Sequence, residues 1–492
     1  MKLSSLLRAV EKSRWPIQLD RYAPAGAADD PDIDSIAHDS RLVGPGTLFC
    51  CITGLKVDGH RFANDAARAG AAALLVERQE RTAPPLPQLI VTSSRAAMGP
   101  LAAALHGQPS EGLEIIGVTG TNGKTTTVML LGHILRSAGR SVELLGTLTG
   151  ARTTPEATEL QERFAAFRER GVQNVAMEVS SHALELHRVD GTRFRAVLFT
   201  NLSPEHLDFH PTMEAYFRAK ARLFDSRFAD FAVVNSDDPR GRLLLDTVAL
   251  PSFPFSINDA KDLKLRATSS TFVWRGHAVE LPMGGHFNVS NALGAATVAA
   301  ALGIDEAVIA SALASAPVVP GRFELVRMGQ PFAVVVDYAH TPAALEGVLE
   351  STRAAIPQGG RLILVFGCGG ERDRLKRPLM GEVATRLADT AILTSDNPRS
   401  EDPLKIIEEV RKGMREVGLS SLHVEPDRRV AIGYALAAAQ EHDSVVIAGK
   451  GHETGQEIGG VTFPFDDRQI VETILAARFG SGRSTDGRGT CE

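Results

Sequence analysis

Short apolar runs alternate with longer stretches of helical character along most of the chain. The central third reads LEIIGVT, TTTVMLLGHILRSAG and VELLGTL, and then NVAMEVS, RAVLFTNL and FAVVNSDD. Strands that alternate with helices predict parallel sheets flanked by helices, so the predicted fold class is α/β. The same alternation begins at TLFCCITG (47–54) and resumes after Gly321 with FAVVVDYAH, RLILVFGCGG, TAILTSDNPR and SVVIAGKGHE.

Breaks in this pattern predict three domains, which also suits 492 residues at roughly 150 residues per domain. We expect the first domain to span residues 1–104, the second 105–320 and the third 321–492. The tail GSGRSTDGRGTCE, from about residue 480, has the composition of turns and disorder, and we expect it to be mobile.

Composition and charge narrow the range of partners. The net charge is −6, so no global basic field indicates nucleic acid or a membrane surface. Charged residues interrupt the N-terminal apolar stretch, and no run approaches the ~18 apolar residues of a membrane span. The four cysteines, Cys50, Cys51, Cys368 and Cys491, lack CxxC spacing and are expected to be reduced. We therefore expect a cytoplasmic protein without nucleic-acid or membrane partners.

The segment IIGVTGTNGKTTT (115–127) predicts a phosphate-binding loop between a strand and a helix. Glycines allow backbone N–H groups to approach phosphate oxygens, and a helix N-terminus favours anions. Lys124 would reach the β- and γ-phosphates, and the Thr125 hydroxyl would bind Mg²⁺. Val118 stands where the usual pattern has glycine, so this is a shorter variant; an ordinary glycine turn before a helix is the alternative. The predicted phosphate-binding residues are Gly120, Thr121, Asn122, Gly123, Lys124, Thr125 and Thr126.

A phosphate loop alone does not identify a reaction, but further segments do. GTNGKTT together with MEVSSHAL (177–184), TNLSPEHLDFH (200–210) and VVDYAHTP (335–342) resembles the Mur ligase family. These enzymes build the peptide stem of bacterial cell-wall precursors, and folylpolyglutamate synthases are their relatives. Residues 39–62, together with FGCGGERDRLKRPLM, SDNPRSEDP and AGKGHE, resemble the members that add the third residue of the stem.

The resemblance covers nearly the whole chain, and it implies a three-domain ligase that uses ATP and Mg²⁺. It implies a central P-loop-type parallel sheet that binds ATP, a first domain that binds the UDP-sugar, and a Rossmann-like C-terminal domain that binds the amino acid. The D-Glu carboxylate of UDP-N-acetylmuramoyl-L-Ala-D-Glu would become an acyl phosphate before the amine of meso-diaminopimelate attacks it. We expect the enzyme to be a monomer.

The resemblance also assigns catalytic and ATP-site residues. Glu178 ends a predicted strand, where an acid can hold Mg²⁺, and His206 matches a ligand of a second Mg²⁺. Lys220 matches a carbamylated lysine, although a solvated helix face is the simpler interpretation of its position. The expected catalytic residues are Lys124, Lys220, Glu178 and His206. The expected metal ligands are Thr125, Glu178, His206 and Lys220 as its carbamate. The expected ATP contacts beyond the loop are Asn291, Arg322 and Asp337, the last of which is suited to accept ribose hydroxyls.

Substrate residues are also implied by the resemblance. For the UDP-sugar and its dipeptide they are Ser40, Leu55, Lys56, Val57, Arg152, Thr153, Thr154, Ser180, Leu186 and Arg188. For the amino acid they are Arg372, Asp396, Asn397, Pro398, Arg399, Gly449 and Glu453. Arg399 carries a planar fork that suits the far carboxylate of diaminopimelate, and the alternative is an arginine that faces solvent after a proline turn. His38, apolar in some relatives, and Leu186, often Gln, depart from the family pattern.

Three other functions compete with this interpretation. An L-lysine-adding ligase would lack a cation for the far carboxylate. A ligase similar to folylpolyglutamate synthase does not account for the segment around DSR (39–41) or for DNPR (396–399). A P-loop switch would leave the VDYAHTP and AGKGHE strand-end loops without a role, and it would hydrolyse nucleotide without the UDP-dipeptide and an amino acid.

Overall fold

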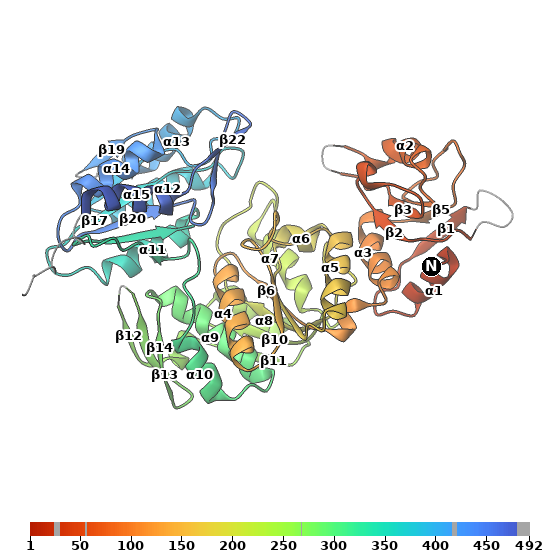
Figure 1. The fold of residues 1–492 in the computed structure, drawn as a ribbon, viewed down its shortest axis with the longest axis horizontal. Coiled ribbons are helices and arrows are strands. Elements are labelled where there is room, and N and C mark those ends of the chain that lie inside the picture. The colour runs from red at the N-terminus through yellow and green to blue at the C-terminus, as the bar shows by residue number, and fades with distance from the viewer. Residues whose placement is uncertain (24–29, 55–56, 267, 416–420, 480–492) are drawn as a thin grey trace, which may run out of the picture.

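The computed structural model describes residues 1–23, 30–54, 57–266, 268–415 and 421–479. It contains three sheets of five or six strands, one in each third of the chain, each with helices packed on it (Figure 1). The predicted three-domain α/β fold is confirmed. The expected boundary at 104 falls in the last turn of α3 (Ser94–Leu105), and the one at 320 falls between α10 (Glu306–Ala314) and β15 (Glu324–Leu325).

The N-terminal domain has the strand order β1-β5-β4-β3-β2. The strands are β1 (Leu19–Ala23), β2 (Ser35–Ala37), β3 (Thr47–Cys50), β4 (Ala73–Val76) and β5 (Gln88–Val91), with helices α1 (Leu3–Glu11), α2 (Ala63–Arg68) and α3. Only β1 is antiparallel to its neighbour. Strands β3 and β4 are buried along their whole length, as their unbroken apolar runs require.

The central domain has a six-stranded, fully parallel sheet with the order β11-β10-β9-β6-β8-β7. The strands are β6 (Glu114–Thr119), β7 (Val142–Leu145), β8 (Asn174–Glu178), β9 (Phe194–Phe199), β10 (Ala229–Asn235) and β11 (Ser252–Phe255). The helices are α4 (Lys124–Ser137), α5 (Ala157–Glu169), α6 (Ser181–Glu185), α7 (Met213–Ala221), α8 (Pro239–Thr247), α9 (His286–Ala301) and α10. Strand β6 lies in the middle, so the loop that follows it opens at the centre of the carboxyl edge.

A small antiparallel sheet, which the apolar runs do not reveal, extends the central domain. Its strands are β12 (Lys261–Leu265), β13 (Ser270–Trp274) and β14 (His277–Leu281). The burial of β13 alternates along the strand, and Phe272 and Trp274 join the same core as α9 and α10. Alternation of this kind produces no continuous apolar run, which is why the sheet was missed.

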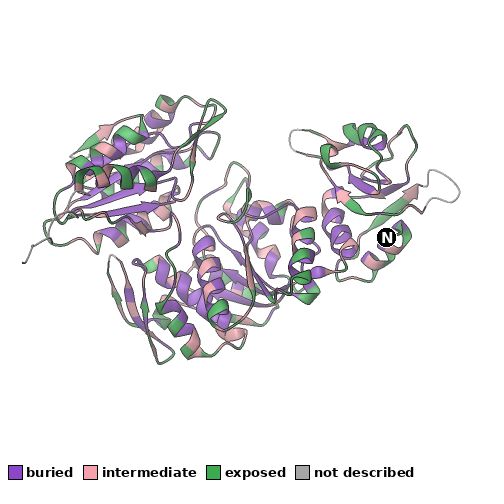
Figure 2. Cartoon of the chain, viewed as in Figure 1, coloured by how far each residue is buried: buried purple, intermediate pink, exposed green. Residues whose placement is uncertain are grey.

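The C-terminal domain has the strand order β15-β16-β20-β17-β18-β19, with only β15 antiparallel. The strands are β16 (Ala333–Asp337), β17 (Leu362–Phe366), β18 (Thr390–Leu393), β19 (Leu422–Val424) and β20 (Ser444–Ala448), and β21 (Gly455–Ile458) and β22 (Val461–Pro464) form a hairpin. The helices are α11 (Pro342–Arg353), α12 (Lys376–Leu387), α13 (Pro403–Arg415), α14 (Arg428–Ala438) and α15 (Asp467–Phe479). Burial is concentrated in the strands and in the helix faces that cover them (Figure 2).

Two further expectations concern termini and membranes. Among the described helices, none combines the length and the apolar character that a membrane crossing needs. The tail from about residue 480, including Cys491, lies outside the described residues.

Candidate active site

The phosphate loop joins the carboxyl end of β6 to the first turn of α4. Gly120 and Gly123 have φ values of 148° and 87°, which favour glycine. A Cβ on Gly120 would overlap the hydroxyl of Thr200, and one on Gly123 would overlap the amide of Asn291. The loop therefore needs both glycines to lie against β9 and α9, and Asn291 lies directly beside it, while its contact with ATP stays a prediction.

Two lysines converge on the carbonyl groups of this loop. Lys124 Nζ donates to Gly120 O at 3.0 Å and to Thr121 O at 2.8 Å, and Lys220 Nζ, from α7, donates to Gly120 O at 2.8 Å. The Lys220 ammonium also lies 4.6 Å from the Tyr216 ring centroid. Burial lowers the pKa of both lysines, and it places that of Lys220 well below its usual value. Because Lys220 is 1% exposed, the alternative of a solvated helix face is wrong.

Glu178 and Thr125 form the second part of the site. Glu178 Oε1 accepts from Thr125 Oγ1 at 3.0 Å and from the Thr147 N–H at 2.8 Å. The Thr125 hydroxyl also lies 3.2 Å from Arg322 Nη2, which donates to it from the C-terminal domain. Glu178 is 2% exposed and is therefore not a surface glutamate.

Glu205, which the sequence analysis did not select, links the two domains at the same place. Its Oε1 lies 2.9 Å from His340 Nε2, and its Oε2 lies 3.6 Å from His206 Nε2. Burial acts to raise the pKa of Glu205, but the hydrogen bond to His340 and the charges of His340 and His206 outweigh it and lower the pKa. Burial lowers the pKa of His206 to about 4, so its imidazole is neutral near pH 7.

Glu205, His206 and His340 line one cavity of about 430 Å³ between the central and C-terminal domains, whereas Gly120 and Lys220 are not among the residues that line it. The predicted residues that line it are Thr121, Asn122, Gly123, Lys124, Thr125, Thr126, Thr153, Glu178, Ser180, His206, Asn291, Arg322 and Asp337. Asp337 is buried, and its carboxylate oxygens accept the N–H groups of Phe323 at 2.6 Å and Ala339 at 2.7 Å. These two bonds use part of the accepting capacity of the carboxylate. The role of Asp337 toward ribose hydroxyls stays a prediction.

The residues fit Mg²⁺ in the presence of a nucleotide. Within the described ranges, no three His, Cys, Asp or Glu side chains are grouped to hold a metal by themselves. Mg²⁺ in nucleotide sites takes one or two protein oxygens and completes its shell with phosphates and water. The Thr125 hydroxyl and the Glu178 carboxylate, 3.0 Å apart, supply two such oxygens.

Three of the predicted dipeptide contacts are linked to one another or to Glu178 and its partner Thr147. Thr154 Oγ1 donates to Glu178 O at 2.9 Å, and Thr153 Oγ1 lies 3.1 Å from Thr147 Oγ1. Arg188 donates to Thr154 O at 3.3 Å and pairs with Glu156 at 2.9 Å.

Other predicted substrate residues lie in or near these elements. Ser180 caps α6 and Leu186 follows its last turn, while Arg152 lies 3.9 Å from Glu156. Ser40 begins a short 3₁₀ turn in the N-terminal domain, where Val57 is exposed. Burial lowers the pKa of His38, and Glu156 acts in the opposite direction. Leu55 and Lys56 lie outside the described residues.

The predicted amino-acid contacts gather on loops at the carboxyl edge of the C-terminal sheet. Arg399 donates to Gly370 O at 2.6 Å and lies 3.3 Å from Glu457, and its side chain is 19% exposed, so the solvent-facing alternative is wrong. A Cβ on Gly369 would lie 3.1 Å from Arg399 Nη1 and 3.8 Å from Arg372 Cγ, which places both arginines beside one loop.

The remaining contacts join the loops after β18 and β20. Asn397 Nδ2 donates to Glu453 Oε2 at 2.8 Å. A Cβ on Gly449 would crowd the Asp396 carboxylate, and a Cβ on Gly370 would overlap the carbonyl of Pro398. The structure thus brings Asp396, Asn397, Pro398, Gly449 and Glu453 together.

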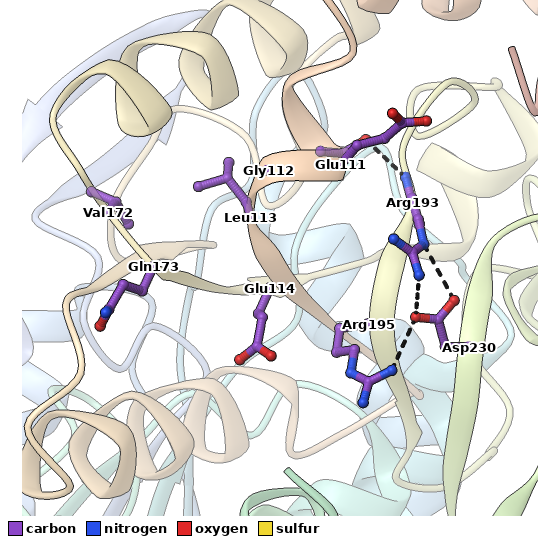
Figure 3. A pocket seen from close by; sticks show the side chains of 10 residues that line it. Glu111, Gly112, Leu113, Glu114, Val172, Gln173, Arg193, Arg195 and Asp230 are labelled. Carbon is purple, nitrogen blue, oxygen red and sulfur yellow. Dashed lines mark hydrogen bonds and ion pairs between the residues drawn. The ribbon is translucent and has the colours of Figure 1, made fainter.

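A second cavity, of about 480 Å³, lies at the opposite edge of the central sheet, where strands β6, β8 and β9 begin (Figure 3). Arg193 and Arg195 point toward Asp230 in this view, and they pair with it at 2.7 Å and 3.2 Å. In open α/β sheets ligands bind at the carboxyl ends of the strands, so this cavity is not the candidate active site.

Comparison with known proteins agrees with this geometry. Three family models match in chain order: "Mur ligase family, catalytic domain" at residues 32–108, "Mur ligase middle domain" at 118–299 and "Mur ligase, glutamate ligase domain" at 321–451. A UDP-N-acetylmuramoyl-L-alanyl-D-glutamate–2,6-diaminopimelate ligase from Streptomyces avermitilis is 46% identical over 473 residues, 91% of this chain and 93% of that protein. The chain belongs to the Mur ligase family.

Solved structures of Mur ligases and their relatives share the fold. A 2,6-diaminopimelate ligase structure of the same description matches this Mur ligase with a TM-score of 0.67 and 34% identity, covering 97% of this chain and 99% of that one. A folylpolyglutamate synthase from Mycobacterium tuberculosis is 17% identical with a TM-score of 0.59, covers 78% of this chain and 95% of that one, and shows the fold alone. The predicted ATP-dependent ligase that joins an acid to an amino acid is confirmed, and the alternative of a P-loop switch is wrong.

Proposed function

We propose that this Mur ligase joins meso-diaminopimelate to the D-Glu carboxylate of UDP-N-acetylmuramoyl-L-Ala-D-Glu in peptidoglycan precursor synthesis, as MurE enzymes do. One observation carries the proposal. A phosphate loop in the central domain contacts the start of the C-terminal domain through Thr125 and Arg322, and the C-terminal domain also carries the arginine-bearing strand-end loop. Such an arrangement can activate a carboxylate on one side and present an amine on the other.

The reaction we propose has two steps. A carboxylate oxygen of D-Glu attacks the γ-phosphorus of ATP, and ADP leaves, giving an acyl phosphate. The neutral amine nitrogen then attacks the acyl carbon, phosphate leaves with the C–O bond electrons, and the nitrogen loses one proton to water or to the departing phosphate as the amide forms. Loop N–H groups and Lys124 neutralise the charge that develops on the transferred phosphoryl group.

The metal ligands that we propose divide into two sets. Thr125 and Glu178 would hold one Mg²⁺, and His206 and Lys220 a second. Bound Mg²⁺ neutralises negative charge on the phosphate oxygens. The neutral imidazole of His206 is the form that ligates metals. Lys220 would act as its carbamate, which forms when a neutral amine adds to the carbon of CO₂ and loses a proton. Burial favours this neutral amine, because it lowers the Lys220 pKa.

The three domains receive separate roles in this proposal. Residues 1–104 bind the UDP-sugar through Ser40 and 55–57, and residues 105–320 bind ATP. The contacts to the muramoyl-dipeptide are Arg152, Thr153, Thr154, Ser180, Leu186 and Arg188. We expect the enzyme to act as a monomer. We place the enzyme in the cytoplasm, where ATP and UDP-linked precursors occur together.

Residues 321–492 bind the amino acid in this proposal. Arg399 donates to the far carboxylate of diaminopimelate, with Arg372 as a second cation, and Glu453 accepts from the ammonium group. Lysine has no far carboxylate for Arg399 and so forgoes these charged hydrogen bonds, which favours diaminopimelate.

A ligation assay with meso-diaminopimelate and L-lysine tests the proposal. We expect phosphate release that requires both the UDP-dipeptide and an amino acid, with a far higher kcat/KM for diaminopimelate. Equal use of lysine would contradict the proposed specificity. Phosphate release with neither amino acid would contradict the proposed ligation itself.

A further inference from the structure

Lys450 is a buried cation to which the mechanism above gives no role. It is the second residue after β20, and its side chain is 0% exposed. Its ammonium donates to Asn397 Oδ1 at 3.2 Å, to Glu453 Oε2 at 3.0 Å and to Gly455 O at 2.6 Å. An ammonium has three hydrogens, so these bonds use its full donating capacity.

The partners of Lys450 come from the two loops that carry the proposed amino-acid contacts. Asn397 follows β18, and Glu453 lies in the loop after β20. Asn397 Nδ2 donates to the same Glu453 oxygen, Oε2, at 2.8 Å, and Asn397 Oδ1 also accepts the Glu457 N–H at 3.0 Å. Lys450 therefore lies at the centre of a network that fixes the spacing between the loops.

This network leaves the two oxygens of Glu453 in different states. Oε2 accepts from both Lys450 and Asn397, whereas Oε1 has no hydrogen-bond partner among the residues that the structure describes. The Glu453 side chain is 31% exposed, so solvent and substrate can reach it. A carboxylate that is fixed through one oxygen presents the other in a defined direction, which reduces the conformational entropy lost on binding.

We propose that Lys450 is a positioning residue for the amine substrate, which holds Glu453 and Asn397 so that Glu453 Oε1 faces the substrate ammonium. The inference rests on the proposed function, because it needs Glu453 to be an amino-acid contact. Two physical effects oppose each other here. The charge of Lys450 repels an incoming ammonium, while its hydrogen bonds orient the carboxylate that attracts it. Orientation dominates, since the ammonium of Lys450 is already paired with Glu453.

The test compares Lys450→Met, Glu453→Gln and the double variant with the wild type. We expect Lys450→Met to raise KM for diaminopimelate by roughly 10-fold to 100-fold, the range for hydrogen bonds to a charged group, because Glu453 loses its fixed direction. The kcat and the KM values for ATP and the UDP-dipeptide should change less than about 3-fold. Lys405→Met, on the exposed side of α13, is the matched control and should change none of these constants.

The double variant separates positioning from general stability. If Lys450 acts through Glu453, Lys450→Met should add little to the KM effect of Glu453→Gln. Additive effects, an unchanged or lower KM for diaminopimelate in Lys450→Met, or equal changes in the ATP constants would each overturn the inference. If Lys450→Met does not fold, Lys450→Gln replaces it in the same comparison, since its amide retains two donors. A wild type that does not use diaminopimelate would contradict the proposed function, a result distinct from these.

Discussion

Cations are held in opposite ways at the phosphate loop and at the amino-acid loops. Lys124 and Lys220 donate to backbone carbonyls, and within the described part of the chain neither is in ion-pair contact with a carboxylate. In the C-terminal domain, Arg399 pairs with Glu457 and Lys450 with Glu453. Below the same loops, the fully buried Arg428 pairs with Asp467 and donates to the carbonyls that precede both loops.

The difference matches the charge of the ligands that we propose. Carbonyl groups hold Lys124 without an ion pair, so its charge remains available to a polyanion, whereas burial favours the neutral amine of Lys220. In the amino-acid loops, Arg399 and Lys450 are already paired with carboxylates before substrate binds. The charged groups of a zwitterionic amino acid must therefore share or replace these partners. Charge therefore acts in the first region by attraction and in the second by orientation.

The largest expected effect comes from removing the charge of Lys124. Lys124→Ala should lower kcat by ~10²–10³, because a preorganised group that neutralises transition-state charge is lost. Steady-state ligation at saturating ATP measures the effect, and circular dichroism checks the fold. Lys261→Ala, on the exposed strand β12, is the control. Near-normal turnover of Lys124→Ala would contradict its role at the phosphates.

The second effect concerns the other lysine of the same loop. Lys220→Ala should reduce activity by ~10²-fold, and short carboxylates such as acetate should restore part of it by replacing the carbamate. The measurement is activity against acetate concentration, with chloride at equal ionic strength as the control. A fully active Lys220→Ala enzyme would exclude the metal-ligand role.

The third effect tests the paired cations of the C-terminal domain. Arg399→Ala should raise KM for diaminopimelate by roughly 10–100-fold, the range for lost hydrogen bonds to a charged group, with little change in KM for ATP. Arg411→Ala, which removes a surface arginine paired with Glu408, is the control. If the KM values for ATP and for diaminopimelate rise by the same factor, Arg399 does not contact the amino acid specifically.

The smallest expected effect is a pH dependence of the free energy of unfolding that arises from His452, in the loop after β20. Burial, followed by the charge of Arg322, lowers the His452 pKa to about 4. In the unfolded chain His452 binds a proton below pH ~6.5, whereas in the folded protein it stays neutral down to about pH 4. Proton binding therefore favours the unfolded state between these two values, so the free energy of unfolding falls as the pH is lowered through this window. His452→Gln should reduce that loss by on the order of 1 kcal/mol, after allowance for partial solvent screening. Urea unfolding at several pH values measures the free energy of unfolding of both proteins. If it depends on pH equally in His452→Gln and in the wild type, His452 is not the group responsible.

Sequence patterns predicted the parallel sheets well, because strands buried on both faces form continuous apolar runs. β8 and β20 are examples, and both are buried along their whole length. The small sheet β12–β14 was missed because its strands are half exposed and alternate. Local motifs identified the phosphate loop in the same way, since its glycines and Lys124 are contiguous.

Contacts between distant segments were not predictable from the sequence. Glu205 lies within a motif that was selected for His206, but its partner His340 is 135 residues away. Lys450 lies within AGKGHE, yet its contact with Asn397 depends on which strands become neighbours. Burial of a charged side chain beside a motif is the signal that would have found both, and only the folded chain provides it.

The contact of Thr125 with Arg322 joins residues that are 197 positions apart, and this has a consequence for synthesis on the ribosome. Domains fold in order as they emerge, at ~5–20 residues per second. The central domain can complete its parallel sheet while the remaining ~170 residues still require roughly 10–30 s of translation. Arg322, Asp337 and His340 line the other side of the cavity, and Asp337 ends β16, which can pair with β20 only once Ser444–Ala448 have been made. A nascent or truncated chain that lacks β20 is therefore expected to bind nucleotide weakly.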